Sequence, residues 1–188
     1  MVKIKTPKYE IVNLVSTGTL NVSLDLYQLA YKLDNIEYEP EQFPGAILRI
    51  KNPRCSMLIF KNGKINVAGC KTEEDMVKAI KVVFKMIAPF SLTPAPQRYT
   101  PKYRITNMVA SGDLGVTLDL YRLAAGLKNV EYEPEQFPGA IMKLENPKAS
   151  MLLFKNGKII MQCSSEEDIK KTLKKVTILL EPYAEEHA

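Results

Sequence analysis

The sequence has few residues of the kinds that bind metals, form cross-links or catalyse reactions. Its three cysteines, Cys55, Cys70 and Cys163, are odd in number and lack the paired spacing of a zinc site. Its one histidine is His187. No phosphate-binding glycine loop and no cluster of carboxylates is recognisable. We therefore expect reduced thiols in an intracellular protein, with no metal, no cofactor and no enzymatic activity.

Long hydrophobic runs are also missing. No stretch approaches the length of a membrane span, and the N-terminal residues lack the apolar core of a signal peptide. The rest of the composition is ordinary for a globular protein, with 46% hydrophobic and 25% charged residues. The formal net charge of +5 permits a polyanionic partner, but it is too common among proteins to identify one.

One stretch occurs twice without change. The residues Glu-Tyr-Glu-Pro-Glu-Gln-Phe-Pro-Gly-Ala-Ile stand at 37–47 and again at 131–141, an offset of 94 residues. The same offset aligns 9–65 with 103–159, where roughly two thirds of the positions are identical. Each copy is too long for a solenoid repeat, so the pattern indicates a domain-sized unit duplicated in tandem. A pseudo-two-fold chain is expected to bind a pseudo-two-fold partner.

The first copy predicts strand, helix, several short strands and a second helix. Alternation predicts a strand from Tyr9 to Thr17, and Ser23 is the expected N-cap of a helix that ends near Leu33. Ile36–Tyr38 is a short extended piece. Three further strands are predicted at 46–51, 55–61 and 64–68, separated by the turn signals Asn-Pro and Asn-Gly. Thr72 and the acids that follow it predict a helix to about Met86.

The second copy predicts the same order of elements. Its strands are expected at 103–111, 140–145, 149–155 and 158–162, and its helices at 117–127 and 166–180. The resulting domains are a frayed lead-in (1–8), a first repeat (9–88), a proline-rich linker (89–101), a second repeat (102–182) and a tail (183–188). The predicted class is α+β, because two such halves can join into one continuous antiparallel sheet with four helices on one face.

That arrangement leaves the other face of the sheet bare. The residues expected on it are almost uncharged, namely Asn13, Val15, Ser56, Leu58 and Phe60 of the first copy and Asn107, Val109, Ser150, Leu152 and Phe154 of the second. A large exposed apolar surface usually marks a binding site. An obligate dimer that buries this face is the alternative, and patterning alone leaves both readings open.

Several motifs together resemble the TATA-box-binding protein family, in its archaeal-type core form. They are Tyr-Glu-Pro-Glu-Gln-Phe-Pro-Gly, Asn-Pro-(Arg/Lys), (Ile/Leu)-Phe-Lys-Asn-Gly-Lys and the Asn-x-Val of each first strand. The resemblance covers roughly residues 9–182, with the motifs in the family's order and spacing. It implies a saddle whose curved concave sheet lies along the minor groove of A·T-rich promoter DNA.

The resemblance also implies roles for individual residues. Asn13 and Asn107 would donate hydrogen bonds at the centre of the site, and Val15, Leu58, Val109 and Leu152 would pack against sugars and base edges. Two phenylalanine pairs would intercalate, Phe43 with Phe60 and Phe137 with Phe154. The residues in the family's phosphate-contact positions are Arg49, Lys64, Lys143 and Lys158, with Lys71 beside them.

Partners follow from the same resemblance. The family's C-terminal acidic loop, its stirrup, binds transcription factor B, which implies this role for Glu133 and Glu135; RNA polymerase would be recruited indirectly. The alternative is that these acids, like Glu39 and Glu41 of the first stirrup, serve only to keep an exposed loop soluble. The implied location is the cytoplasm and nucleoid of an archaeon, or the nucleus of a eukaryote.

The chain departs from the family at the last strand of each repeat. Where the family has Thr-Gly-Ala-Lys, the first copy reads Ala68-Gly69-Cys70-Lys71. The second reads Gln162-Cys163-Ser164-Ser165 with one residue missing, a glycine. Asn66 is polar where the family has an apolar contact. An alternative is therefore a divergent paralogue, whose saddle acts mainly in protein interaction or self-association and has weak DNA specificity.

Overall fold

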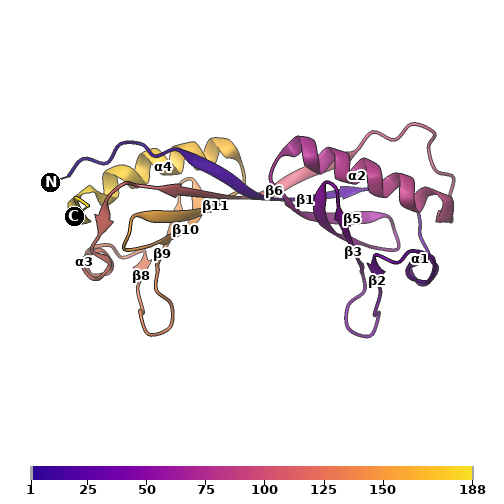
Figure 1. The fold of residues 1–188 in the computed structure, drawn as a ribbon, viewed down its shortest axis with the longest axis horizontal. Coiled ribbons are helices and arrows are strands. Elements are labelled where there is room, and N and C mark those ends of the chain that lie inside the picture. Colours follow the sequence, from indigo (N-terminus) through magenta and orange to yellow (C-terminus); the bar gives the residue numbers. More distant parts are fainter. Residues whose placement is uncertain (1, 188) are drawn as a thin grey trace. The chain divides into compact units, whose positions relative to one another are not determined.

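The structure, a computed structural model, describes residues 2–187, which form two compact units (Figure 1). The first-repeat unit comprises Asn13–Thr106. The second-repeat unit comprises the segment that ends at Val12 and the segment that begins at Asn107. The boundaries fall inside the first strand of each repeat, β1 (Tyr9–Thr19) and β6 (Lys102–Asp113). Each of these two strands therefore contributes residues to both units.

The first-repeat unit has an antiparallel sheet with the strand order β2-β3-β4-β5-β1. Besides β1, its strands are β2 (Ile36–Glu37), β3 (Ala46–Lys51), β4 (Arg54–Ile59) and β5 (Lys64–Cys70). The predicted turns join β3 to β4 and β4 to β5. In the second turn Gly63 has a φ of +83°, a conformation that glycine adopts without steric cost.

The long helix of this unit is α2 (Glu73–Ile87), and its N-terminus is as predicted. The Thr72 hydroxyl accepts a hydrogen bond from the Asp75 amide at 3.0 Å, and three acids occupy the first turn. Its buried face consists of Met76, Ala79, Ile80, Val83, Phe84 and Ile87. The 3-10 turn η1 (Ala88–Phe90), which contains Pro89, ends the helix.

The short helix of each unit starts later than predicted. α1 (Leu26–Lys32) is capped by Asp25, not by Ser23, because the Asp25 carboxylate accepts from the amides of Tyr27 and Gln28. α3 (Leu120–Gly126) is capped in the same way by Asp119. The residues before these caps are extended: Thr117–Leu118 form β7, which pairs with β12 (Ala184–Glu185).

The second-repeat unit repeats the sheet with the order β8-β9-β10-β11-β6. Its further strands are β8 (Val130–Glu131), β9 (Ala140–Glu145), β10 (Lys148–Leu153) and β11 (Lys158–Cys163). The long helix is α4 (Glu166–Leu180), capped by Ser165 and followed by the 3-10 turn η2 (Glu181–Tyr183). Within residues 2–187 the chain thus has four α-helices and antiparallel sheets, which confirms the predicted α+β class.

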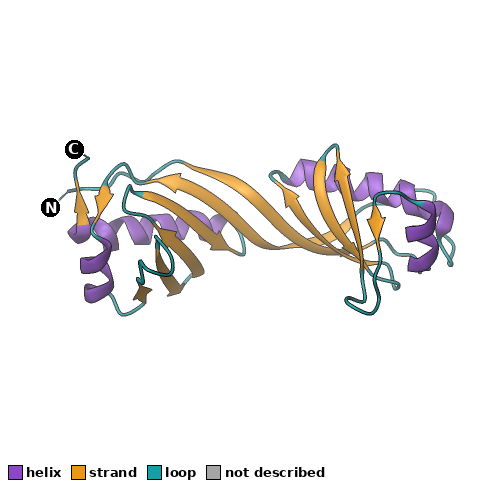
Figure 2. Cartoon of the chain, turned by 60° about the horizontal axis from the view of Figure 1, so that its bottom comes forward, coloured by secondary structure: helices purple, strands orange, loops and turns teal. Residues whose placement is uncertain are grey.

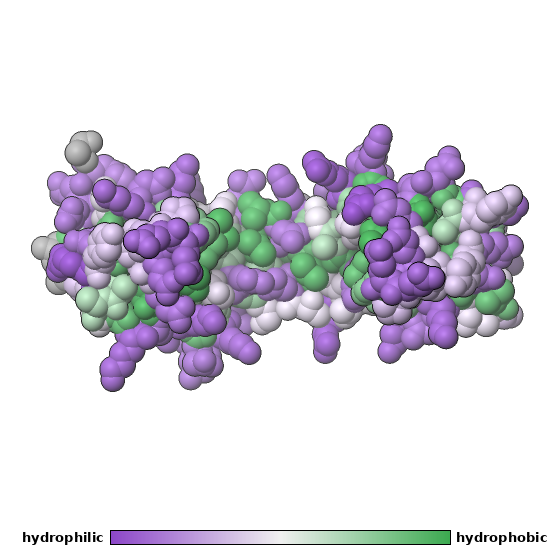
Figure 3. Space-filling model, turned by 90° about the horizontal axis from the view of Figure 1, so that it is seen from below, coloured by the Kyte–Doolittle hydropathy of each residue, from purple (hydrophilic) through white to green (hydrophobic). Residues whose placement is uncertain are grey.

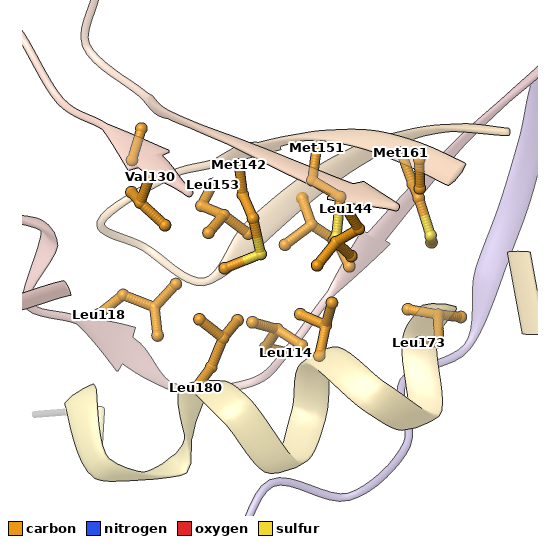
Figure 4. Close-up of a cluster of buried hydrophobic side chains, with 14 of the residues drawn as sticks. Leu114, Leu118, Val130, Met142, Leu144, Met151, Leu153, Met161, Leu173 and Leu180 are labelled. Carbon is orange, nitrogen blue, oxygen red and sulfur yellow. The ribbon is translucent and has the colours of Figure 1, made fainter. Parts of the chain in front are cut away.

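In each unit the long helix lies along one face of the sheet (Figures 1 and 2). Figure 4 shows this layer in the second-repeat unit, where Met142, Met151 and Leu153 of the sheet face Leu173 and Leu180 of α4. All five side chains are at most 1% exposed. Burying a side chain of this size stabilises a fold by about 1.5–3 kcal/mol. The core therefore orients each sheet, with one face toward its helix and the other outward.

The N-terminal segment is not frayed, contrary to the prediction. Ile4 is 8% exposed and belongs to the core of the second-repeat unit, and its amide donates to the Glu181 carboxylate at 3.3 Å. The proline-rich linker is likewise attached to the first-repeat unit. Tyr99 stacks on Phe84 with ring centroids 4.2 Å apart, and its hydroxyl donates to the Thr19 carbonyl at 2.6 Å. Ile4 and Tyr99 thus anchor the N-terminal segment and the linker to the core of a unit.

Candidate nucleic-acid interface

The face of each sheet opposite the long helix is open and largely uncharged. On β4 the side chains alternate between buried and partly exposed, and β10 repeats the pattern. The partly exposed positions include all those predicted for the bare face, namely Asn13, Val15, Ser56, Leu58, Phe60, Asn107, Val109, Ser150, Leu152 and Phe154. Figure 3 shows hydrophobic surface on this side of each unit, bordered by hydrophilic side chains. The alternation that buries one face of the sheet thus exposes an apolar face on the other.

Two phenylalanine pairs lie beside the open faces, one in each unit. The ring centroids of Phe43 and Phe60 are 5.9 Å apart with an interplanar angle of 60°. Those of Phe137 and Phe154 are also 5.9 Å apart, with an angle of 62°. Phe43 is 37% exposed, a high value for an aromatic ring that a folded core could have enclosed. The four predicted intercalating residues are therefore brought together as two matching, accessible edge-to-face pairs.

A glycine lies against each pair. A Cβ atom at Gly45 would be 2.8 Å from Cε2 of Phe43 and 3.0 Å from Cε1 of Phe60. The distances from Gly139 to Phe137 and Phe154 are the same. The glycine two residues after each stirrup phenylalanine is thus needed for space, because any side chain there would displace the rings.

The two asparagines at the start of the open faces have different surroundings. The Asn13 side-chain oxygen accepts a hydrogen bond from the Gly69 amide at 2.8 Å. Gly69 has a φ of +94° and lies where the register of β1 and β5 shifts by one residue, between the pairs Leu14–Cys70 and Ser16–Val67. Such a bulge leaves the extra residue outside the strand ladder, so the Gly69 amide is free to bond a side chain.

No bulge occurs at the same place in the second-repeat unit. β11 pairs with β6 in unbroken register from Lys158–Asp113 to Cys163–Met108. β11 lacks one residue relative to β5, the glycine that was already recognised as missing from the sequence. Among residues 2–187, the Asn107 side chain has no hydrogen-bond partner of the kind that Gly69 provides for Asn13.

The predicted phosphate-contact residues lie on exposed positions around the open faces. Lys64 and Lys158 start β5 and β11, and Lys71 directly follows β5. Arg49 and Lys143 are the equivalent residues of β3 and β9. Arg49 forms an exposed ion pair with Glu37, with Nη1 and Oε1 3.6 Å apart. A surface pair of this kind contributes about 0–1 kcal/mol, so Arg49 can exchange its partner readily.

The predicted partner-binding acids, Glu133 and Glu135, are exposed on the second stirrup (residues 132–139). This loop projects away from the helix side of its unit (Figure 1). The Glu133 carbonyl accepts from the amides of Gln136 and Phe137 at 2.9 and 3.0 Å, and Glu39 of the first stirrup (residues 38–45) makes the same two bonds. The backbone of each loop is therefore a defined turn, and its acidic side chains point to solvent.

Comparison with known proteins decides the family. The profile described as "Transcription factor TFIID (or TATA-binding protein, TBP)" matches residues 8–90 and 102–183, which are the two repeats. The chain belongs to the TATA-binding protein family. The resemblance expected from the motifs is thereby confirmed.

Individual relatives of the TATA-binding protein family agree. The TATA-box-binding protein of Methanocaldococcus jannaschii is 41% identical over 93% of this chain and 94% of that protein. The TATA-box-binding protein of Pyrobaculum aerophilum is 42% identical over 92% of this chain and 85% of that protein. A solved structure, "Methanococcus jannaschii TBP", matches with a TM-score of 0.85 at 39% identity, over 94% of this chain and 99% of that one. The tandem-duplicated α+β fold is therefore the TATA-binding protein fold.

Sequence reasoning missed several cations of this TATA-binding protein family member. Lys51 and Arg54 join Arg49 around a hollow that reaches Gly69. Lys102 and Arg104 line another hollow, beside Phe60. The Asn-Pro-Arg motif predicts a turn, but nothing in it indicates that its basic flank lines a hollow. No sequence pattern indicates the position of Lys102 and Arg104. Their segment belongs to the second repeat in sequence but to the first-repeat unit in space.

A tyrosine pair at the base of each stirrup was also missed. Tyr27 of α1 lies edge-to-face with Tyr38, with centroids 5.0 Å apart, and Tyr121 of α3 lies in the same way against Tyr132. Tyr27 and Tyr121 are 67% and 68% exposed. Leu24 and Leu29, which lie near Tyr27 in the sequence, are buried. The exposed aromatic surface of Tyr27 instead adjoins the acidic loop.

The cysteines are buried. Burial raises the pKa of the Cys163 thiol, and the neighbouring Cys70 thiol together with burial raises the pKa of Cys55. No group of three or more histidine, cysteine, aspartate or glutamate side chains is placed to hold a metal ion within the described part of the chain. None of the helices in residues 2–187 has the length and hydrophobicity that crossing a membrane requires.

Proposed function

We propose that this protein is a general transcription initiation factor that binds A·T-rich promoter DNA through its open sheet faces. The observation that carries the proposal is the pair of matching, accessible phenylalanine pairs, each beside an uncharged apolar face. A surface of this kind has no evident use in a monomer that is exposed to water. The relatives are named for binding the TATA box, which supports the same reading.

The chemistry of the open face suits the minor groove of A·T pairs. These pairs present only acceptors there, whereas a G·C pair adds the guanine amino donor. Asn13 and Asn107 supply amide donors, and Val15, Leu58, Val109 and Leu152 supply apolar surface for sugars and base edges. A guanine amino group facing this apolar surface would lose its hydrogen bond to water, so the face disfavours G·C pairs.

The phenylalanine pairs act as wedges at the two ends of the site. Inserting a pair into a base step unstacks the step, at a cost of about a few kcal/mol that is known from members of this family and proteins like them. The additional protein surface that the bent groove covers as it follows the sheet offsets this cost. Arg49, Lys64, Lys71, Lys143 and Lys158 bind phosphates, which positions the protein but gives little sequence selectivity.

The second stirrup recruits the next factor. Glu133 and Glu135 contact transcription factor B, which in turn brings RNA polymerase to the bent promoter. The exposure of both acids and the defined backbone turn beneath them support this role. A preformed loop loses little conformational entropy when a partner binds, which favours association.

Fluorescence energy transfer across a TATA-containing duplex labelled at both ends tests the proposal. The natural chain should bend this duplex and should not bend a control in which G·C replaces A·T. The double variant Phe137→Ala/Phe154→Ala should abolish bending while its circular dichroism spectrum stays unchanged. Full bending by the double variant would contradict the wedge assignment.

A second candidate function is that of a divergent paralogue that works mainly through protein contacts. The observation that favours it is the absence of the family's threonines, replaced by Ala68 and Gln162 at the open face. In the same assay this paralogue would bind DNA weakly and without A·T preference unless transcription factor B were added. Binding in no condition would leave the open face to protein interaction or self-association.

A further inference from the structure

The open faces of the two units differ in the surroundings of one asparagine, although the sequence around it is repeated. Asn13 and Asn107 are equivalent residues of β1 and β6. Asn13 accepts the Gly69 amide proton, and Gly69 has no counterpart on β11. Among the described residues this difference in side-chain bonding coincides with the bulge between β1 and β5.

The Gly69 bond fixes which end of the Asn13 amide is available to a ligand. A backbone N–H can only donate, so the side-chain atom that faces it must be the oxygen. The two N–H groups of the Asn13 amide are then the atoms left to bind DNA. Held in this way, Asn13 is a donor that cannot also serve as an acceptor.

The Asn107 amide is not fixed in this way. No hydrogen bond to its side chain is formed by residues 2–187, and β11 has no extra residue whose amide could reach it. An unconstrained amide can rotate by half a turn and present either its oxygen or its nitrogen. Asn107 can therefore donate to the acceptors of an A·T pair or accept from the amino group of guanine.

We propose that Gly69 is a positioning residue that makes the first-repeat half of the site selective for A·T at the pair next to the centre. The second-repeat half, which lacks this glycine, accepts G·C at the equivalent pair. This inference rests on the proposed function, because it concerns the same DNA-binding surface. Its consequence is that the chain binds an asymmetric site in one orientation despite its internal repeat.

Directed DNA cleavage measures this orientation. The variant Glu41→Cys provides an exposed thiol on the first stirrup for an iron chelate that cleaves nearby DNA, because the natural cysteines are buried. One duplex is a palindrome of A·T pairs, on which symmetry requires equal cleavage of both halves. The other has a single central A·T pair of one half replaced by G·C. On this duplex we expect about tenfold more cleavage on the A·T half.

Four variants in this background test the role of Gly69. Deleting Gly69, or inserting a glycine between Gln162 and Cys163, makes the two units alike and should bring the cleavage ratio close to one. Asn13→Ala should do the same, because it removes the fixed donor. Asn107→Ala should also bring the ratio close to one, because it removes the group that can accept from guanine. Thermal unfolding shows whether the Gly69 deletion still folds. If it does not, the glycine insertion and Asn13→Ala still test the proposal.

The outcomes separate this inference from the proposed function. Binding of both duplexes with equal cleavage of the halves by the otherwise natural chain would overturn the inference and leave the proposed function standing. An unchanged preference after the glycine insertion and in Asn13→Ala would also overturn it. Failure of the natural chain to bind the all-A·T duplex would overturn the proposed function, and the inference with it.

Discussion

Gly139 lies so close to Phe137 that a methyl group at the glycine would approach Cε2 of the ring to 2.8 Å. The same methyl group would come within 3.0 Å of Phe154. Gly139→Ala should therefore push both rings out of their edge-to-face arrangement without removing either. We expect the variant to fold but to bend TATA-containing DNA less than the natural chain does, in the energy-transfer assay described above.

The control for this variant is Gly115→Ala. Gly115 has a φ of +69°, and a Cβ atom there would have no neighbour within 4 Å among residues 2–187, so alanine strains the backbone but touches no ring. It should lower thermal stability, by about 1–2 kcal/mol for this conformation, and leave bending unchanged. Equal bending by Gly139→Ala and the natural chain would show that the ring arrangement is not needed.

Reversing the charge of the second stirrup should separate partner binding from DNA binding. Glu133→Arg should weaken the complex with transcription factor B on DNA, because a cation replaces one of the two stirrup carboxylates that are proposed to contact this factor. DNA binding alone should not weaken, since the residue is not among the groups proposed to contact DNA. Gel-shift titration of the partner onto the protein–DNA complex measures this effect.

The repeat provides a matched control, because Glu39 stands in an identical loop with the same backbone hydrogen bonds. Glu39→Arg should leave the affinity for transcription factor B unchanged. An equal loss in both variants would contradict the assignment of docking to the second stirrup alone.

The cations of the open face should set the salt dependence of DNA binding. Each phosphate contact contributes a slope of about −0.9 to the logarithm of the binding constant against the logarithm of salt concentration. Lys64→Ala and Lys158→Ala should each make the slope less steep by about this amount. Lys78→Ala should not change it, because Lys78 lies on α2 in an ion pair with Glu74. An equal change in Lys78→Ala would place the phosphates elsewhere.

A tyrosine at the start of β1 should make stability depend on pH in alkaline solution. Burial and the hydrogen bond that Tyr9 donates to Glu166 at 2.7 Å raise the pKa of Tyr9 from 10.0 to about 12. A raised pKa in the folded state means that the contribution is complete below pH 10 and is lost as the pH rises toward 12. The free energy of unfolding should therefore fall across this window.

Tyr9→Phe should remove this part of the pH dependence, measured by urea unfolding at pH 9, 10, 11 and 12. All other titratable groups are common to the two proteins, so the difference between the two curves isolates Tyr9. Tyr103 donates in the same way to Glu73 in the first-repeat unit, and its pKa is also raised. Tyr103→Phe should independently remove a second part of the pH dependence of the free energy of unfolding. Parallel curves for the natural chain and Tyr9→Phe would contradict the role of this bond.

The regular elements with strong local signals could be predicted from the sequence. The bounds of β3, β9 and α4 agree with the prediction, because turn signals, N-caps and hydrophobic alternation lie within the segments themselves. The start of α1 could not be predicted. Ser23 satisfies the capping rule, but its amide bonds the Thr93 hydroxyl, a residue far along the chain. Long-range contact thus overrides local preference.

The candidate site shows the same division. Its open face follows from alternation along each strand, so its residues could be recognised one strand at a time. The Asn13–Gly69 bond depends on the register between β1 and β5, which no single segment determines. The missing glycine was visible in the sequence, but its effect on Asn107 required the pairing of two strands.

The ends of β1 and β6 have a consequence for any attempt to divide the protein. Tyr9 and Ile11 pack in the second-repeat unit, while Tyr103 and Ile105 pack in the first-repeat unit. A chain cut within the linker would therefore give two halves that each lack a piece of their own core. A polypeptide with a single repeat could complete its fold only by taking this strand end from another copy of itself.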